Sequence, residues 1–83
     1  MSITKTELKT LGNQVTCTVG SVESGVGYFY CGTDTGDVLK YNTQTEAMTT
    51  IKNVGQKILS VALYSGTLWM GLADGKFISL TTS

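Results

Sequence analysis

The chain has 83 residues, of which 41% are hydrophobic and 14% charged, and its six basic and six acidic residues give a formal net charge of zero. A chain of this length forms one small domain, whose core is marginal unless disulfides, a metal or oligomerisation add to it. Because like charges do not cluster, the sequence lacks the electrostatic footprint of a protein that binds nucleic acid or an anionic membrane.

The N-terminal stretch MSITKTELKT has no apolar core of the length that a signal peptide needs, and no stretch approaches the ~18 apolar residues of a membrane span. We therefore expect a soluble, cytoplasmic protein. Cys17 and Cys31 lie in apolar strand-like runs, and the chain has no histidine. This predicts no metal site and no cofactor. The two thiols are either reduced and packed as small hydrophobic residues, which we favour, or joined by one disulfide between adjacent strands.

Short β-strand patterns separated by turn signals follow one another along the whole chain. Loose alternation predicts an edge-type strand over residues 3–11, and Gly12-Asn13 turns the chain before a strand over 14–19. Residues 20–27, GSVESGVG, are rich in glycine and are interpreted as a flexible connection. The other predicted strands span residues 28–32, 38–42, 47–54, 58–63, 67–71 and 76–80. No sustained 3.6-residue apolar period occurs, so the predicted fold class is all-β with eight strands.

Two of the predicted β-hairpins share one pattern. In each, an apolar run ends in a glycine, three residues form a turn, a second glycine follows, and another apolar run begins. Gly32 and Gly36 carry this pattern in the first hairpin, and Gly71 and Gly75 carry it 39 residues later. We expect Gly32 and Gly71 to be equally intolerant of substitution, and Gly25, in the glycine-rich connection, to tolerate alanine. A repeat of about 40 residues with four short strands is typical of a β-propeller blade.

The two hairpins, GTDTGDVLKYN and GLADGKFISLT, resemble the corresponding part of WD-repeat propeller blades. Tyr41-Asn42 and Leu80-Thr81 stand where that family has Trp-Asp, so the resemblance is to a degenerate, WD40-like blade. It implies two four-stranded blades in one domain of residues 1–83. Blade one spans residues 14–54, and blade two spans residues 56–82 and is completed by strand 3–11 of a neighbouring chain.

Two blades cannot close a ring, because propellers typically have 4–8 blades. The expected assembly is therefore a homo-oligomer that closes head to tail, with a trimer of six blades favoured over a tetramer of eight. The alternative is that the chain is a fragment of a larger propeller.

Catalytic residues are not predicted, because the chain has no histidine to act as a general base and no Ser or Cys with an adjacent partner. The function that we expect is a non-catalytic binding module for a protein or a small ligand, at the ring faces or the grooves between blades. A carbohydrate-binding lectin is the sharper alternative, since small two-bladed lectins form six-bladed trimers, and an enzyme with its site between chains is the least supported. The candidate ligand-binding residues are five aromatic residues and three turn aspartates: Tyr28, Tyr30, Tyr41, Tyr64, Trp69, Asp34, Asp37 and Asp74. Tyr41 and Tyr64 lie near strand ends and are expected to be exposed. For the other aromatic residues we favour packing against the adjacent blade over exposure in a groove, and for the aspartates we favour a role in the turns over a metal or acid–base role.

Overall fold

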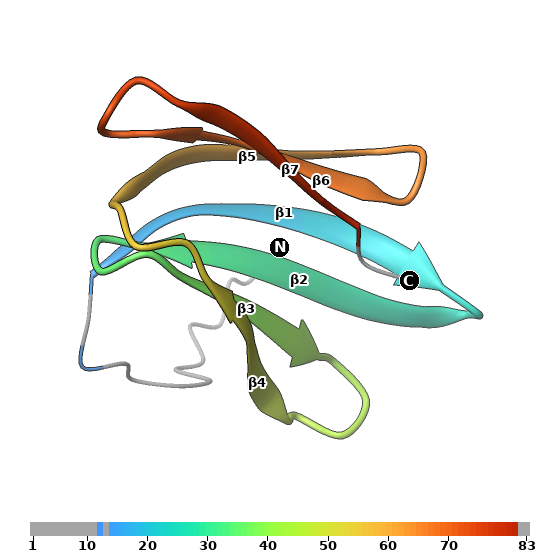
Figure 1. Ribbon diagram of the computed structural model, residues 1–83. Helices are drawn as coiled ribbons and strands as arrows, with labels where there is room; N and C mark the ends of the chain where they lie inside the picture. The colour runs from blue at the N-terminus through green and yellow to red at the C-terminus, as the bar shows by residue number, and fades with distance from the viewer. Residues whose placement is uncertain (1–11, 13, 82–83) are drawn as a thin grey trace, which may run out of the picture.

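The computed structural model describes residues 12 and 14–81, and it folds this part of the chain into two antiparallel β-sheets without a helix (Figure 1). Sheet one contains β1 (Val15–Glu23), β2 (Val26–Thr33), β3 (Asp37–Asn42) and β4 (Met48–Asn53), in that order. Sheet two contains β5 (Ile58–Tyr64), β6 (Thr67–Leu72) and β7 (Phe77–Thr81). The predicted all-β class is confirmed. Over the described residues, no helix is long and apolar enough to cross a membrane.

All the predicted strands from residue 14 onward are present, with ends that differ by a few residues. The predicted strand over residues 3–11 lies outside the described residues. The flexible connection over residues 20–27 is wrong, because β1 continues to Glu23 and β2 begins at Val26. Ser24 and Gly25 alone form the turn, with φ angles of 51° and 78°. Positive φ at both central residues is the signature of the tight turn that suits the twist of a hairpin.

The β5–β6 hairpin of sheet two ends in the same kind of turn, at Ser65 (φ 54°) and Gly66 (φ 76°). The first hairpin is longer by two rungs, in which Val22 pairs with Gly27 and Glu23 pairs with Val26. The extra four residues therefore lengthen a regular hairpin. We call these two rungs the hairpin extension.

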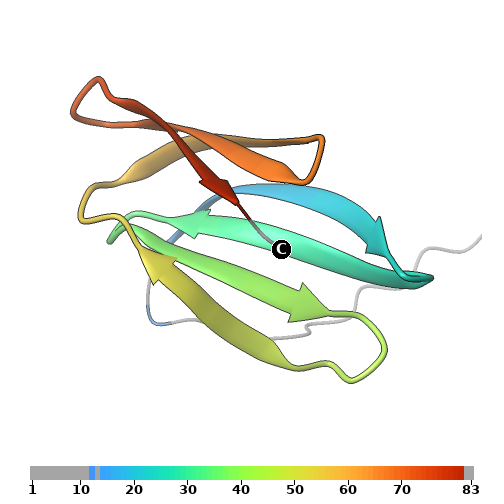
Figure 2. The ribbon, with the colours of Figure 1, turned by 45° about the vertical axis from the view of Figure 1, so that its right-hand side comes forward.

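The two sheets are stacked, with β5 lying beside β1 in both views of the ribbon (Figures 1 and 2). Their facing sides form one hydrophobic core, and six of its residues are almost or completely buried. These are Tyr30 and Val38 of sheet one and Ile58, Leu68, Met70 and Leu72 of sheet two. Burying apolar surface in this way is the main stabilising contribution to the fold.

The second and third strands pair in the same register in both sheets. Gly32 pairs with Val38, and Gly71 pairs with Phe77. A β-bulge also interrupts the first ladder at the same place, between Val15 and Cys17 in β1 and between Ile58 and Ser60 in β5. Residues that occupy the same rung of the two sheets are called counterparts below. Tyr30 and Trp69 are counterparts in this sense, as are Val38 and Phe77.

The two sheets approach each other closely at the start of β5. A Cβ atom at Gly32 would lie 2.6 Å from Cγ2 of Ile58, so the Ile58 side chain packs directly on the bare backbone of Gly32. The single hydroxyl proton of Thr16 is shared between the Ile58 carbonyl oxygen and the Gly32 carbonyl oxygen, the latter 3.2 Å from the hydroxyl oxygen. Gly32 is thus a seat for Ile58, which fixes the position of sheet two on sheet one.

The connection between the sheets is also held in place. The Val54 amide donates a hydrogen bond of 2.9 Å to the carbonyl oxygen of Gly36, in the β2–β3 turn. Gly36 has a φ of +92°, and a Cβ atom there would lie 2.8 Å from the Gln56 carbonyl oxygen. Glycine is required at this position both by the backbone angle and by the close approach of the connection.

Candidate binding surfaces

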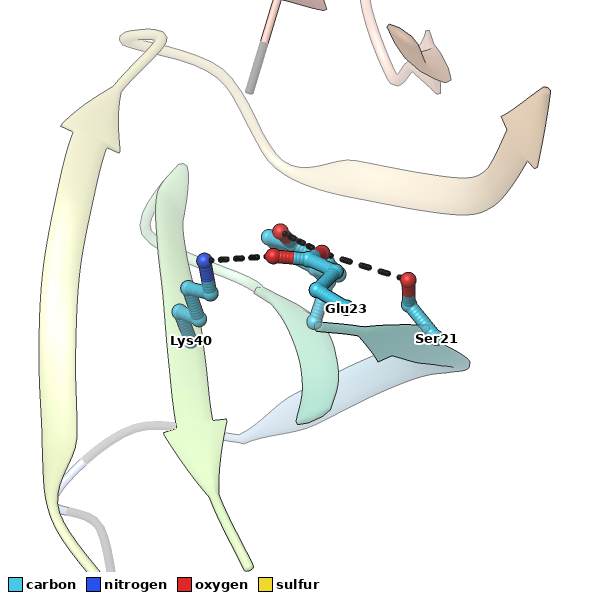
Figure 3. Close-up of polar contacts among 4 residues, drawn as sticks. Ser21, Glu23 and Lys40 are labelled. Carbon is cyan, nitrogen blue, oxygen red and sulfur yellow. Dashed lines mark hydrogen bonds and ion pairs between the residues drawn. The ribbon is translucent and has the colours of Figure 1, made fainter. Parts of the chain in front are cut away.

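A polar cluster occupies the end of sheet one that carries the hairpin extension (Figure 3). The carboxylate of Glu23 accepts hydrogen bonds from the Tyr30 hydroxyl (2.7 Å) and the Ser21 hydroxyl (3.2 Å). The Lys40 ammonium group donates to the same carboxylate at 3.0 Å. Its nitrogen also lies 4.3 Å from the centre of the Tyr28 ring, within the range of a cation–π interaction. The extension therefore places Glu23 where the hydroxyl of a completely buried tyrosine needs a partner.

The hydrogen bonds in this cluster stabilise the ionised forms of both charged groups. The Tyr30 hydroxyl and, next, the Lys40 ammonium hold the pKa of Glu23 below its usual value. The hydrogen bond to Glu23 is the main cause that raises the pKa of Lys40. A carboxylate with a lowered pKa is a weak general base at neutral pH, because a base works best when its pKa is near the working pH. The chemistry of this cluster suits structural support or ligand contact better than proton transfer.

An aromatic pair occupies the side of sheet two that faces away from sheet one. The rings of Trp69 and Phe77 are stacked, with centroids 6.1 Å apart and planes inclined by 16°. Trp69 is 36% exposed and Phe77 is 72% exposed. The same side carries Tyr64, which is 75% exposed, near the turn of the β5–β6 hairpin. We call this side the Trp69 face.

The predicted binding residues are divided between different parts of the molecule. Tyr28 and Tyr30 belong to the polar cluster, whereas Trp69 and Tyr64 belong to the Trp69 face. Tyr41 was expected to be exposed near a strand end, and this is wrong, because it is only 5% exposed. It lies in β3, which has a strand on each side, and it pairs with Phe29 and Met48.

The three candidate aspartates accept hydrogen bonds within or beside their turns. Asp34 accepts one from the Gln14 amide (3.2 Å), and Asp74 accepts one from the Lys76 amide (3.1 Å). Asp37 accepts one from the side-chain amide of Asn53 (2.8 Å). Over the described part of the chain, no three His, Cys, Asp or Glu residues gather in a way that could hold a metal ion. Asp74 therefore has the local backbone role that aspartate commonly has in turns, whereas Asp34 and Asp37 accept hydrogen bonds from residues that are distant in the sequence.

The sequence-based reasoning missed Glu23, Lys40 and Phe77. Glu23 was hidden in the supposed connection, although Val19, Ser21 and Glu23 alternate with a period of two, as they would on one face of a strand. Phe77 could have been identified from the repeated pattern. It follows Trp69 by the same number of residues as Val38 follows Tyr30.

Both cysteines are free thiols, which agrees with the favoured of the two alternatives. Cys17 pairs with Gly32, and Cys31 precedes that glycine in β2, so the two side chains point to opposite sides of sheet one. Burial raises the pKa of the Cys31 thiol, which makes it a poor nucleophile at neutral pH.

Comparison of the chain with protein-family models, with curated proteins and with solved structures found no match.

Proposed function

We propose that this chain is a non-catalytic binding module that assembles with copies of itself into a closed β-propeller ring. The observation that carries the proposal is the contrast between two counterparts. Tyr30 is completely buried between the sheets, whereas Trp69 is 36% exposed on the Trp69 face. Sheet one therefore uses this side to pack against sheet two, while the equivalent side of sheet two has no sheet against it among the described residues.

The contact between the sheets is head to tail, because each sheet contributes a different side to it. A contact of this kind repeats from copy to copy until rotation closes a ring. Three chains would give six blades and four chains would give eight, both within the usual range of propellers. Six blades from a trimer is the assembly that we favour.

The number of strands gives a second argument for assembly. Sheet one has four strands, whereas sheet two has three among the described residues, so β7 is an edge strand. Exposed edges are sites at which another strand can pair. Residues 3–11 of a neighbouring chain would supply the fourth strand of sheet two.

Light scattering over a series of protein concentrations tests the proposal. We expect a mass three times the 8.8 kDa of one chain. Removal of residues 1–11 should lower the mass to that of one chain. A full-length chain that stays folded and monomeric at high concentration would refute the proposal and support the alternative, a fragment of a larger propeller.

The ligand of such a ring would bind where blades or chains meet, since several weak equivalent sites gain avidity together. A carbohydrate is the second candidate, as an alternative to a second copy on the Trp69 face. The stacked rings of Trp69 and Phe77 favour it because exposed aromatic rings can stack on sugars. Quenching of Trp69 fluorescence on a panel of glycans tests this candidate. Trp69→Ala and Tyr64→Ala should each weaken binding, and an unchanged fluorescence with every glycan would dismiss the lectin.

A further inference from the structure

Several residues that are buried in the core between the sheets have counterparts in the other sheet that are apolar but exposed. Tyr30 and Val38 of sheet one are 0% exposed, and their counterparts on the Trp69 face are Trp69 and Phe77. Single exposed apolar residues are common on protein surfaces. Trp69 and Phe77, however, form a stacked pair, and they occupy the two positions that are completely buried in sheet one. Such a pair indicates a surface that packs against another sheet.

Residues of sheet two that are buried in the core also have exposed counterparts in sheet one. Ile58 and Leu68 of sheet two are 0% exposed, and their counterparts in sheet one are Val15, which is 44% exposed, and Phe29, which is 47% exposed. These two residues lie on the first two strands of sheet one. Inside the chain, the two sheets meet where β1 and β2 contact β5.

Part of this side of sheet one is already covered. Cys31, Leu39 and Tyr41 are 5–7% exposed, although they lie outside the core between the sheets. A second contact would therefore use the half of the sheet that carries β1. Here the Phe29 ring lies over Gly20, since a Cβ atom at Gly20 would be 3.2 Å from Cε1 of Phe29.

Gly71 of sheet two is the counterpart of Gly32, on which the Ile58 side chain packs. The counterpart of Ile58 itself is Val15 of sheet one. Among the described residues, a Cβ atom at Gly71 would approach only one atom closely, the Ser60 hydroxyl oxygen at 3.1 Å. Ile58 packs on Gly32 within the chain, whereas no described side chain packs on Gly71 in the same way.

We infer that the Trp69 face binds a second copy of this chain, with Val15 of that copy seated on Gly71 and its Phe29 against Trp69. This inference rests on the proposed assembly and names the two surfaces that meet in it. The occupant is a second copy because the Val15 and Phe29 side of sheet one has the same register as the Ile58 and Leu68 side of sheet two, which already packs against Tyr30 and Val38 within the chain. The contact is the internal one repeated between chains.

The experiment compares one variant of each surface. Gly71→Val closes the seat on the Trp69 face, and Phe29→Asp places a charge on the opposite surface. Both should be folded by circular dichroism, because Gly71 has no positive φ and Phe29 is half exposed. Each should run as a single chain by light scattering at concentrations that assemble the wild type, which is at least a tenfold loss of affinity.

Mixing the two variants provides the decisive measurement. The intact Trp69 face of Phe29→Asp can bind the intact Phe29 surface of Gly71→Val, so the mixture should form a dimer of one chain of each. If the Trp69 faces of two copies instead bind each other, Phe29→Asp alone assembles like the wild type, and this result overturns the inference.

Val22→Asp is the matched control. Val22 is 78% exposed and lies in the hairpin extension, which has no counterpart in sheet two, so this variant should assemble normally. Loss of assembly in Val22→Asp as well would contradict a repeated contact. If the wild type assembles while Gly71→Val and Phe29→Asp assemble equally well, the inference fails and the proposed ring stands. If the wild type never assembles, both fail.

Discussion

The two sheets have the same register and β-bulge, but their equivalent positions lie in different surroundings. In sheet one, Tyr30 is covered by sheet two and its hydroxyl is held by Glu23. In sheet two, the same rung carries Trp69, which has no hydroxyl and stacks on Phe77 at the surface. Strand pairing alone therefore does not decide which side of a sheet is buried. The residues on each rung and the neighbour that the chain supplies decide it.

The largest expected effect comes from the glycines of the two turns. Gly36 and Gly75 have almost the same φ, 92° and 90°, but only Gly36 faces backbone atoms of the connection between the sheets. Gly36→Ala should lower the free energy of unfolding by about 2–5 kcal/mol, the sum of left-handed strain and overpacking. Gly75→Ala should cost about 1–2 kcal/mol, from strain alone. Equal losses in urea unfolding would mean that the connection does not press on the turn.

Gly32 and Gly71 are predicted from the sequence to be equally intolerant of substitution, but their surroundings differ. Neither has a positive φ, so the backbone angle does not restrict them. Gly32→Ala should destabilise the chain by about 1–3 kcal/mol, because the new methyl group would overlap Ile58. Gly71→Ala should cost less than about 1 kcal/mol, since it meets only the side-chain hydroxyl of Ser60. Chemical unfolding at low protein concentration, where the chain is monomeric, separates these effects from assembly.

The third prediction tests the polar cluster of sheet one against its counterpart. Tyr30→Phe should lower the free energy of unfolding by about 1 kcal/mol, because it removes the hydrogen bond to Glu23 from a buried ring. Trp69→Phe, the matched change in sheet two, should have almost no effect on the stability of the single chain. An unchanged free energy of unfolding in Tyr30→Phe would show that the hydrogen bond to Glu23 does not contribute to stability.

The smallest effect is a dependence of stability on pH. Folding lowers the pKa of Glu23, so its contribution is complete above the unfolded value of about 4.3 and is lost as the pH falls through the lower folded value. The urea midpoint of the wild type should therefore fall between pH 5 and the acid range more steeply than that of Glu23→Gln. The difference is small because the Glu23 side chain is 34% exposed to solvent. Parallel curves for the two proteins would show that the hydrogen bonds in the cluster do not favour the ionised form.

The hairpins that contain Gly32 and Gly71 could be predicted because each has a short stretch of turn-forming residues between two apolar runs. The β1–β2 hairpin was misread because three glycines lie close together. Gly20 and Gly27 are strand residues, where a Cβ atom would meet Phe29 and Thr43, and Gly25 is the only one of the three in the turn. Because Gly25 has a φ of +78°, we now expect alanine there to be destabilising, contrary to the expectation from the sequence.

The burial of individual aromatic residues could not be predicted from the pattern. In β3, Val38, Leu39 and Tyr41 are all buried, so both sides of the strand are covered and alternation does not identify the core side. The polar cluster was missed for a related reason. Lys40 of β3 meets Glu23 of β1 because the hairpin extension carries Glu23 past the end that the hairpin has in sheet two. This contact depends on the length of the hairpin, which was not predicted.

The order of the strands also has a consequence for how the chain folds. Within each sheet, the described strands pair in the order of the sequence, and the four described strands of sheet one all end before residue 54. Contacts between neighbouring segments form quickly, because little loop-closure entropy is lost. During synthesis on the ribosome, sheet one can form its ladders before β5 has been made, as expected for units that fold from the N-terminus. Sheet one would then be the template on which sheet two condenses, and Ile58, the first residue of β5, would be the first to reach its seat on Gly32.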